Sequence, residues 1–394
     1  MKNDLVDPKP KIVWHNIFFF ASTGLIAVIG APLYISRFGV PVFELWLTVF
    51  YIVITSISIT AGYHRLYSHS AYRAHPVVQC LLLFFGAAAF EQSALKWSSQ
   101  HRDHHQFTAK RGDPYSIGEG FFYAHIGWVL FWAHTLRFKN VKDLKTNRFV
   151  MLQHRYYLFW ALVSGIILPF AIGLWYGNLL AAFIFPVCAR LAFVHHATFC
   201  VNSVCHLFGG EPYDLHSTAR NNWMVALVTN GEGFHNYHHR FPSDYRNGIR
   251  WYQWDPTKWL IRSLAALHMA WNLKEASKFR ILEARLLVHQ ELLRRRESRR
   301  KKPIRLERFF SDFEGGYQVL RSRLFIWEKN TKEYRQMLHG PGREPSKAIR
   351  QRARKTMNIS KQRFKHTYQR RERYLKSNRQ PTADAKTNLQ QSRS

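Results

Sequence analysis

Four apolar runs, each about twenty residues long, constrain the fold of this 394-residue chain more than any other feature. They cover residues 17–36, 43–62, 157–176 and 179–201. A helix of about 20 residues crosses the roughly 30 Å hydrocarbon core of a bilayer. The runs therefore predict four membrane-spanning helices. The short connections RFGVPV and GN join them in pairs, so we expect two hairpins.

Positive charge is distributed unevenly along the chain. There are 57 Lys and Arg against 25 Asp and Glu, a net charge of +32. Residues 272–394 alone contain 34 basic and 12 acidic residues, a surplus of 22. Such basicity is typical of nucleic-acid binders and of membrane proteins with a basic cytoplasmic side. The apolar runs favour the second class, and no nucleic-acid partner is expected.

This asymmetry predicts two domains, a membrane-embedded domain at residues 1–271 and a basic cytosolic tail at 272–394, partly helical or disordered. An apolar stripe opens the tail at helical spacing. Its members are Phe279, Leu282, Leu286 and Leu293. The stripe predicts a helix that lies on anionic lipid.

The flanks of the hairpins predict the topology. The segments beyond their open ends, 63–156 and 202–394, are rich in Lys and Arg, which stay in the cytoplasm. Both termini and all histidine clusters are then cytoplasmic, and no signal peptide is expected. Two further apolar stretches do not span: 77–90 predicts a buried or re-entrant helix, and 121–136 an interfacial amphipathic helix.

Nine of the 21 histidines stand in short clusters next to the predicted spans. They are His64 and His69 in HRLYSH, His101, His104 and His105 in HRDHH, His206 in NSVCH, and His235, His238 and His239 in HNYHH. The i, i+3, i+4 spacing of the two triple clusters places their rings on one face of a helix. Asn202 precedes His206 by four residues and shares its face. His64 and His69 lie about 140° apart on an α-helix, so we expect them to serve different metals or to sit across a helix end.

Nine neutral imidazoles packed into a partly dry site would each need a polar partner. Metal ions supply such partners and require the neutral ring. Two ions with four or five nitrogen ligands each account for all nine. Imidazole suits iron, zinc, copper and nickel, so the ligand type alone does not name the metal. Structural zinc sites favour cysteine, whereas an open, nitrogen-rich pair of sites fits redox iron better.

The segments HRLYSH, HRDHH and NGEGFHNYHHRFPSDY, in this order and spacing, resemble the membrane fatty acyl desaturases, specifically the Δ9 acyl-CoA (stearoyl-CoA type) branch. NSVCHLFGGEPYD resembles the segment that leaves that family's fourth span, and the likeness covers roughly residues 12–270. It implies an all-α membrane protein whose four-helix stem carries a cytosolic helical cap with the histidine boxes. It also implies two iron ions, held by the nine histidines and, through a water, by Asn202.

The same resemblance implies an O2-dependent reaction that introduces a cis double bond, expected at Δ9, into a saturated fatty acyl chain. Trp97 and Thr198 match positions that line the bend of the substrate tunnel. Phe199 stands where tryptophan is usual and Glu91 where glutamine is usual, so the preferred chain length and bond position stay open. Acyl-CoA is the favoured carrier, with a phospholipid-bound chain as the alternative, because residues 99–100 are Ser-Gln instead of the Arg-Asp pair of the animal enzymes.

No HPGG segment of the kind found in cytochrome b5 appears, so we expect a separate electron donor. A ferredoxin, a rubredoxin or a cytochrome b5-like protein, with an NAD(P)H reductase, would serve. The expected location is a bacterial inner membrane.

Two other functions stay open. A di-iron membrane hydroxylase shares the histidine boxes, and a metal transporter would place ionisable groups inside the spans.

Overall fold

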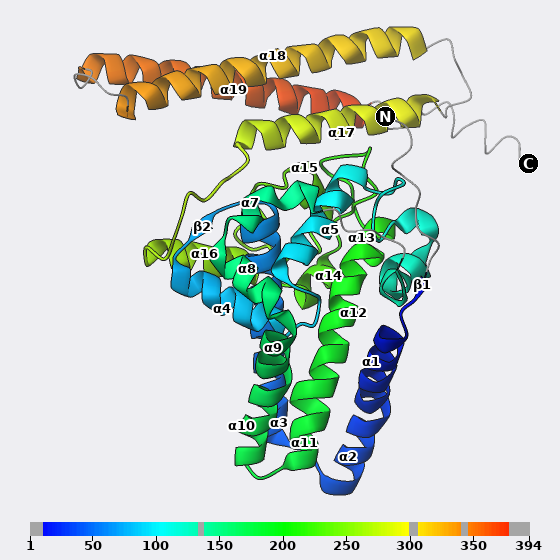
Figure 1. Cartoon of the computed structure of the whole chain (residues 1–394). Helices are drawn as coiled ribbons and strands as arrows, with labels where there is room; N and C mark the ends of the chain where they lie inside the picture. The colour runs from blue at the N-terminus through cyan, green and yellow to red at the C-terminus, as the bar shows by residue number, and fades with distance from the viewer. Residues whose placement is uncertain (1–10, 133–137, 299–305, 340–345, 378–394) are drawn as a thin grey trace, which may run out of the picture. The chain divides into compact units, whose positions relative to one another are not determined.

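The computed structural model describes residues 11–132, 138–298, 306–339 and 346–377, and most of them are helical (Figure 1). The chain divides after Ala276 into two compact units, which we describe separately. The first contains the apolar helices and the histidine clusters, and the second contains the basic C-terminal helices.

Four helices of the first unit are long and apolar enough to span a membrane, as the sequence predicts. They are Trp14–Phe38, Val42–Ser68, Tyr157–Trp175 and Leu179–Leu207. Their parts are α1 (Trp14–Leu25), η1 (Ile26–Gly30) and α2 (Ala31–Phe38); α3 (Val42–Ile57) and η2 (Ser58–Ser68); α9 (Tyr157–Leu162), η6 (Val163–Ile167) and α10 (Leu168–Trp175); and α11 (Leu179–Phe183), η7 (Ile184–Ala189), α12 (Arg190–Asn202) and α13 (Val204–Leu207). The second and fourth helices run past the predicted ends and carry His64 and His206.

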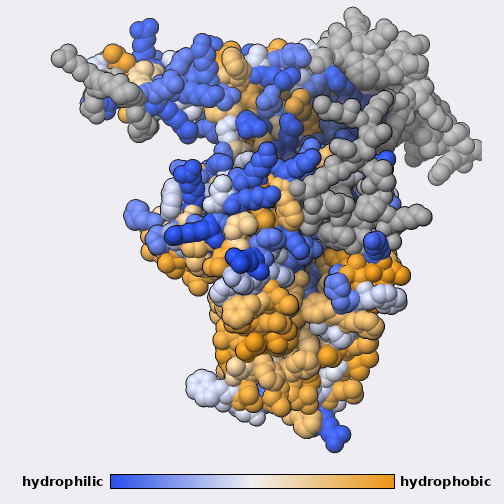
Figure 2. Space-filling model, viewed as in Figure 1, coloured by the Kyte–Doolittle hydropathy of each residue, from blue (hydrophilic) through white to orange (hydrophobic). Residues whose placement is uncertain are grey.

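The spans turn back on themselves through short connections (Figure 1). Residues 39–41 join the first two and residues 176–178 the last two. Gly39 and Gly177 adopt φ values of 82° and 97°, a left-handed conformation that glycine reaches without strain. Apolar side chains cover the outside of these helices (Figure 2), with Trp46 71% and Ile167 56% exposed. A contiguous apolar surface of this size is suited to lipid.

The second span changes helix type where it enters the cap. Segment η2 is a π-helix, in which the backbone N–H of residue i+5 bonds the carbonyl of residue i. Accordingly, the His69 N–H donates to the His64 carbonyl at 3.1 Å. Residues five apart therefore lie about one turn above each other. Of the two alternatives expected for these histidines, service to different metals, which assumed an α-helix, is wrong, because both lie in one cluster. A position across a helix end is confirmed, since His69 directly follows the last residue of η2.

Arg190 is fully buried in the fourth span. Its guanidinium donates to the carbonyls of Ala88 (2.6 Å) and Pro186 (3.0 Å) and to that of Gly165. Ala88 follows α4 (Pro76–Ala87), and Gly165 lies in the third span. One side chain thus ties the end of a short helix to two spans.

Short helices and two small strand pairs build the cap. The helices are α4, α5 (Ala94–Phe107), η3 (Ile117–Glu119), η4 (Tyr123–Gly127), α6 (Trp128–Leu130), η5 (Lys139–Val141), α7 (Lys142–Lys145), α8 (Arg148–Arg155), α14 (Trp223–Val228), α15 (His235–Arg240) and α16 (Pro256–Ala266). Strand β1 (Lys11–Ile12) pairs with β3 (Phe131–Trp132), and β2 (Arg73–Ala74) pairs with β4 (Ala270–Trp271), both antiparallel. The stretch 77–90 forms α4, too short to span. The stretch 121–136 is helical only to Leu130 and then enters β3; residues 133–136 lie outside the described residues.

The C-terminal unit contains three long helices, α17 (Lys278–Ser298), α18 (Leu306–His339) and α19 (Lys347–Ser377). They share an apolar core that includes Phe279, Leu286, Leu293, Tyr317, Leu320, Leu324, Trp327 and Phe364. The stripe predicted to lie on lipid is therefore buried inside this unit. A helix alone cannot bury such a stripe, and the sequence did not reveal that two partner helices cover it.

Candidate metal centre

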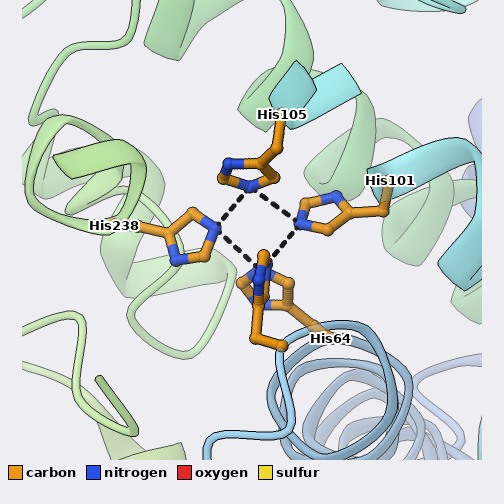
Figure 3. Close-up of side chains that lie close together, drawn as sticks. His64, His101, His105 and His238 are labelled. Carbon is orange, nitrogen blue, oxygen red and sulfur yellow. Dashed lines mark hydrogen bonds between the residues drawn. The ribbon is translucent and has the colours of Figure 1, made fainter. Parts of the chain in front are cut away.

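The nine box histidines gather in two clusters. The first contains His64, His69, His101, His105 and His238, and the second His104, His206, His235 and His239. Within each cluster the ring nitrogens lie within 4.8 Å of one another. In the first cluster the rings of His64, His101, His105 and His238 point toward a common centre (Figure 3), and the Nε2 atoms of His105 and His238 are 2.8 Å apart.

Each of the two triple boxes is divided between the clusters. On α5, His101 and His105 join the first cluster and His104 joins the second. On α15, His238 joins the first cluster while His235 and His239 join the second. In each triplet the i, i+4 pair shares one centre and the remaining ring reaches the other, so α5 and α15 both bridge the two centres.

Four rings are held from behind through Nδ1. His64 lies 2.9 Å from Glu232, His104 2.9 Å from Asp113, His206 2.7 Å from Thr218, and His101 3.4 Å from Tyr115. A carboxylate beside Nδ1 favours rings that carry their proton on that nitrogen, as at His64 and His104. Their Nε2 lone pairs then point into the clusters, the arrangement that metal-binding histidines adopt.

The surrounding protein disfavours the charged form of five of the box histidines. Burial, together with neighbouring histidines, lowers the pKa of His101, His105, His235, His238 and His239 well below the usual range. Within the second cluster, Nε2 of His104 is buried and makes no hydrogen bond to the described residues. Converging lone pairs on neutral rings repel one another, and a bound cation removes that repulsion. The residues present therefore fit two metal ions.

A buried ionic network supports the first cluster. Arg65 contacts Glu232 and Asp255, each at 3.0 Å, and Asn247 donates to Glu232 at 2.8 Å. Burial acts to raise the pKa of Glu232, but His64 and Arg65 beside it lower it below the ordinary value. The carboxylate thus stays ionised and keeps its hold on His64.

A cavity of about 1140 Å³ connects the clusters with the membrane spans. Its lining includes His64 and His101 of the first cluster, His104 and His235 of the second, and Phe19, Phe20, Phe90, Leu162 and Ile166 from the apolar part of the unit. Its volume slightly exceeds the roughly 300–1,000 Å³ of most small-molecule pockets. The site can therefore hold a long apolar ligand beside both clusters.

Residues 44–272 match the family model described as fatty acid desaturase. The chain belongs to the fatty acid desaturase family. A probable acyl-CoA desaturase of Schizosaccharomyces pombe is 43% identical over 67% of this chain and 57% of its own length. Acyl-CoA desaturase 1 of Saccharomyces cerevisiae is 36% identical over 75% and 55%. Human stearoyl-CoA desaturase is 37% identical over 72% and 82%. The chain thus spans little more than half the length of these two yeast relatives.

In this desaturase-family chain, Trp97 and Thr198 both line the cavity, and both donate to Glu91. Thr198 Oγ1 lies 2.9 Å from one carboxylate oxygen, and Trp97 Nε1 lies 3.2 Å from the other. Burial raises the pKa of Glu91 to about 7. A single carboxyl therefore holds together the two residues that the resemblance leads us to expect at the bend of a substrate tunnel.

The turn that carries Glu91 is strained. Phe90 and Gln92 on either side have φ values of 56° and 73°, unusual for residues with a Cβ. The Gln92 N–H donates to the Tyr157 hydroxyl at 3.0 Å, which fixes the turn to the third span. Such strain persists only where surrounding contacts enforce it and is concentrated at functional sites.

Asn202 also lines the cavity, at the end of α12. It shares this lining with His104 and His235 of the second cluster. Its expected role in holding a metal through a water remains a prediction.

Sequence reasoning missed Glu232, Asp113, Thr218 and Arg65. Glu232 stands inside NGEGFH and Asp113 nine residues after His104, so acidic residues next to the boxes were the available signal. Spacing alone could not show which ring each one contacts.

Proposed function

We propose that this chain is an O2-dependent desaturase that introduces a cis double bond, at Δ9, into a saturated fatty acyl chain carried by coenzyme A. The observation that carries the proposal is the cavity that joins an apolar lining between the spans to both histidine clusters. An acyl chain lying there places its methylene groups beside the metals. The names of the yeast and human relatives agree with an acyl-CoA substrate.

We assign two iron ions to the clusters, with the nine histidines as ligands and Asn202 as a water-mediated one. Bound iron supplies the activation of O2 that an unactivated C–H bond requires and that side chains cannot provide. The protein's own contribution is to position the acyl chain. The strained turn at Glu91, with Trp97 and Thr198, sets where the chain bends, and the apolar lining excludes water.

We propose that a ferredoxin, a rubredoxin or a cytochrome b5-like protein, reduced through an NAD(P)H reductase, supplies the electrons. We place the clusters and both termini on the cytoplasmic side of the membrane, because the basic segments flank the open ends of the spans. A phospholipid-bound chain is the alternative substrate. Desaturation assays with acyl-CoA and with acyl phospholipid, on the same preparation, distinguish the carriers.

Fatty-acid profiling of a host with and without the gene tests the reaction. We expect a new cis alkene, located by mass spectrometry, in cells with the wild-type chain. His104→Ala and His238→Ala, one from each cluster, should both abolish it and lower the iron content. His216→Ala is the matched control, because His216 is exposed and belongs to neither cluster.

A hydroxy fatty acid without a new alkene would instead show the related hydroxylase. Substantial alkene formation by both alanine variants would contradict the ligand assignment, since loss of a direct ligand leaves a metal incompletely held.

A further inference from the structure

The last helix of the C-terminal unit concentrates the unit's positive charge. Helix α19 contains twelve Lys and Arg and a single acidic residue, Glu372. Its neighbours are far more balanced. Helix α18 contains six basic and five acidic residues, and α17 six and three. The imbalance is thus a property of one helix.

The charge of α19 lies away from its packed side. Phe364 is 5% exposed and contacts the Trp327 ring, with 5.7 Å between the ring centroids, so this side of α19 faces the core. On a helix with 3.6 residues per turn, Lys355 and Arg373 point directly away from Phe364, and Lys365 lies about 80° from them on the flank. All three are exposed.

Further exposed basic residues widen this surface. They are Lys347, Arg352, Arg354, Arg363 and Arg370. The helix has 31 residues and is therefore about 46 Å long. Ile359, 39% exposed, lies on the same side as Lys355. Hydrophilic side chains dominate the visible surface of α18 and α19 (Figure 2).

We propose that the outward face of α19, defined by Lys355, Lys365 and Arg373 with their exposed basic neighbours, binds the anionic headgroups of a lipid bilayer. The charge complementarity is direct, because each Lys or Arg close to an anionic leaflet adds to the attraction. This function is separate from the desaturase site, and its test does not depend on that site.

Two observations favour lipid over other polyanions. The spans hold the chain at a bilayer, and the C-terminal unit follows Ala276, whose N–H donates to Asp244 of the cap at 2.8 Å. No further candidate span exists in the described part of this unit, so the helix meets the membrane surface at a high effective concentration. In addition, an interfacial surface accommodates an aliphatic side chain such as Ile359 among cations.

The experiment uses the full-length protein in nanodiscs of neutral phosphatidylcholine, mixed with separate vesicles. We expect the protein to float with vesicles that contain phosphatidylglycerol, not with phosphatidylcholine vesicles, and to dissociate as salt is raised. The triple variant Lys355→Gln, Lys365→Gln, Arg373→Gln should lose at least about tenfold in capture affinity.

The matched control is Lys329→Gln, Lys332→Gln, Arg335→Gln, which removes the same charge from exposed positions on α18. Circular dichroism and thermal melts establish that both variants are folded. An equal loss in the two variants would show a net-charge effect and overturn the proposal. Vesicle capture that persists in the α19 variant would also overturn it. If that variant still binds vesicles but no longer binds an oligoribonucleotide, the face is an RNA site instead.

Discussion

Nδ1 of His104 lies 2.9 Å from Oδ1 of Asp113, and both side chains are buried. The other oxygen of Asp113 accepts from the Ala109 backbone N–H at 2.9 Å, so the carboxylate is held in place. His64 and Glu232 stand in the same relation in the other cluster. Each cluster therefore has a carboxylate that fixes the tautomer of one of its rings.

Replacing this carboxylate should weaken the second metal site. Asp113→Asn offers His104 an amide that can donate as well as accept, so the proton is no longer confined to Nδ1. We expect iron affinity at one of the two sites to fall by roughly 10- to 100-fold, measured by iron titration of the apoprotein. Glu119→Gln is the control, because Glu119 is an exposed carboxylate in the same region. Unchanged iron affinity in Asp113→Asn would refute this role for Asp113.

Glu91 should make stability depend on pH. Burial raises its pKa from 4.5 to about 7 in the folded protein, so the folded state binds this proton more tightly than the unfolded chain. Its contribution to stability is therefore complete below about pH 4.5 and is lost as pH rises toward 7. As pH rises from 4.5 to 7, we expect the Tm of the wild-type protein to fall relative to the Tm of Glu91→Gln. Thermal melts of both proteins in the same detergent measure it, and parallel Tm profiles would contradict it.

The structure changes where a truncation should be made. The absence of ligand clusters beyond residue 300 suggests that deleting 301–394 leaves the chemistry intact. That cut, however, keeps α17 and removes α18 and α19, leaving Phe279 and Leu286 uncovered. We expect truncation after Ala276 to retain two irons and wild-type turnover, and truncation after residue 300 to aggregate. Size-exclusion chromatography and iron analysis compare the two. Loss of turnover in an iron-loaded 1–276 protein would show that the C-terminal unit contributes to catalysis.

Asn202→His tests whether a weakly held position is needed for O2. An imidazole at this place on the cavity wall would fill that position with a strong nitrogen ligand. We expect iron content near wild type with strongly reduced turnover. If Asn202 only supports the end of α12, the substitution should lower the melting temperature while turnover per iron-loaded molecule stays unchanged. Iron stoichiometry and turnover, measured on one preparation, separate the two.

The sequence predicted the spans well because membrane burial demands long apolar runs that few other folds require. It also predicted which histidines gather, since the boxes flank those spans. The sequence could not predict how the nine histidines divide between the two clusters. That division depends on a π-helix at Ser58–Ser68 and on two helices that each reach both centres, and local spacing reveals neither.

Contacts between distant residues were equally hidden. Glu232 lies 168 residues from His64, and the partners of the stripe at Phe279 and Leu286 come from α18 and α19. Periodicity indicates that a helix has an apolar face. It does not indicate whether lipid or protein covers that face, because both are apolar.

Arg190 bears on how the protein enters its membrane. A lone arginine at the centre of a transmembrane helix costs about 2.5–3.5 kcal/mol on insertion scales. Its partners here, the carbonyls of Ala88 and Gly165, belong to segments synthesised before the fourth helix. The fourth helix can therefore enter the bilayer at low free-energy cost only when the segments that contain Ala88 and Gly165 already lie beside it. During biogenesis the fourth helix should therefore insert last, together with the helices that it packs against and not as a single helix.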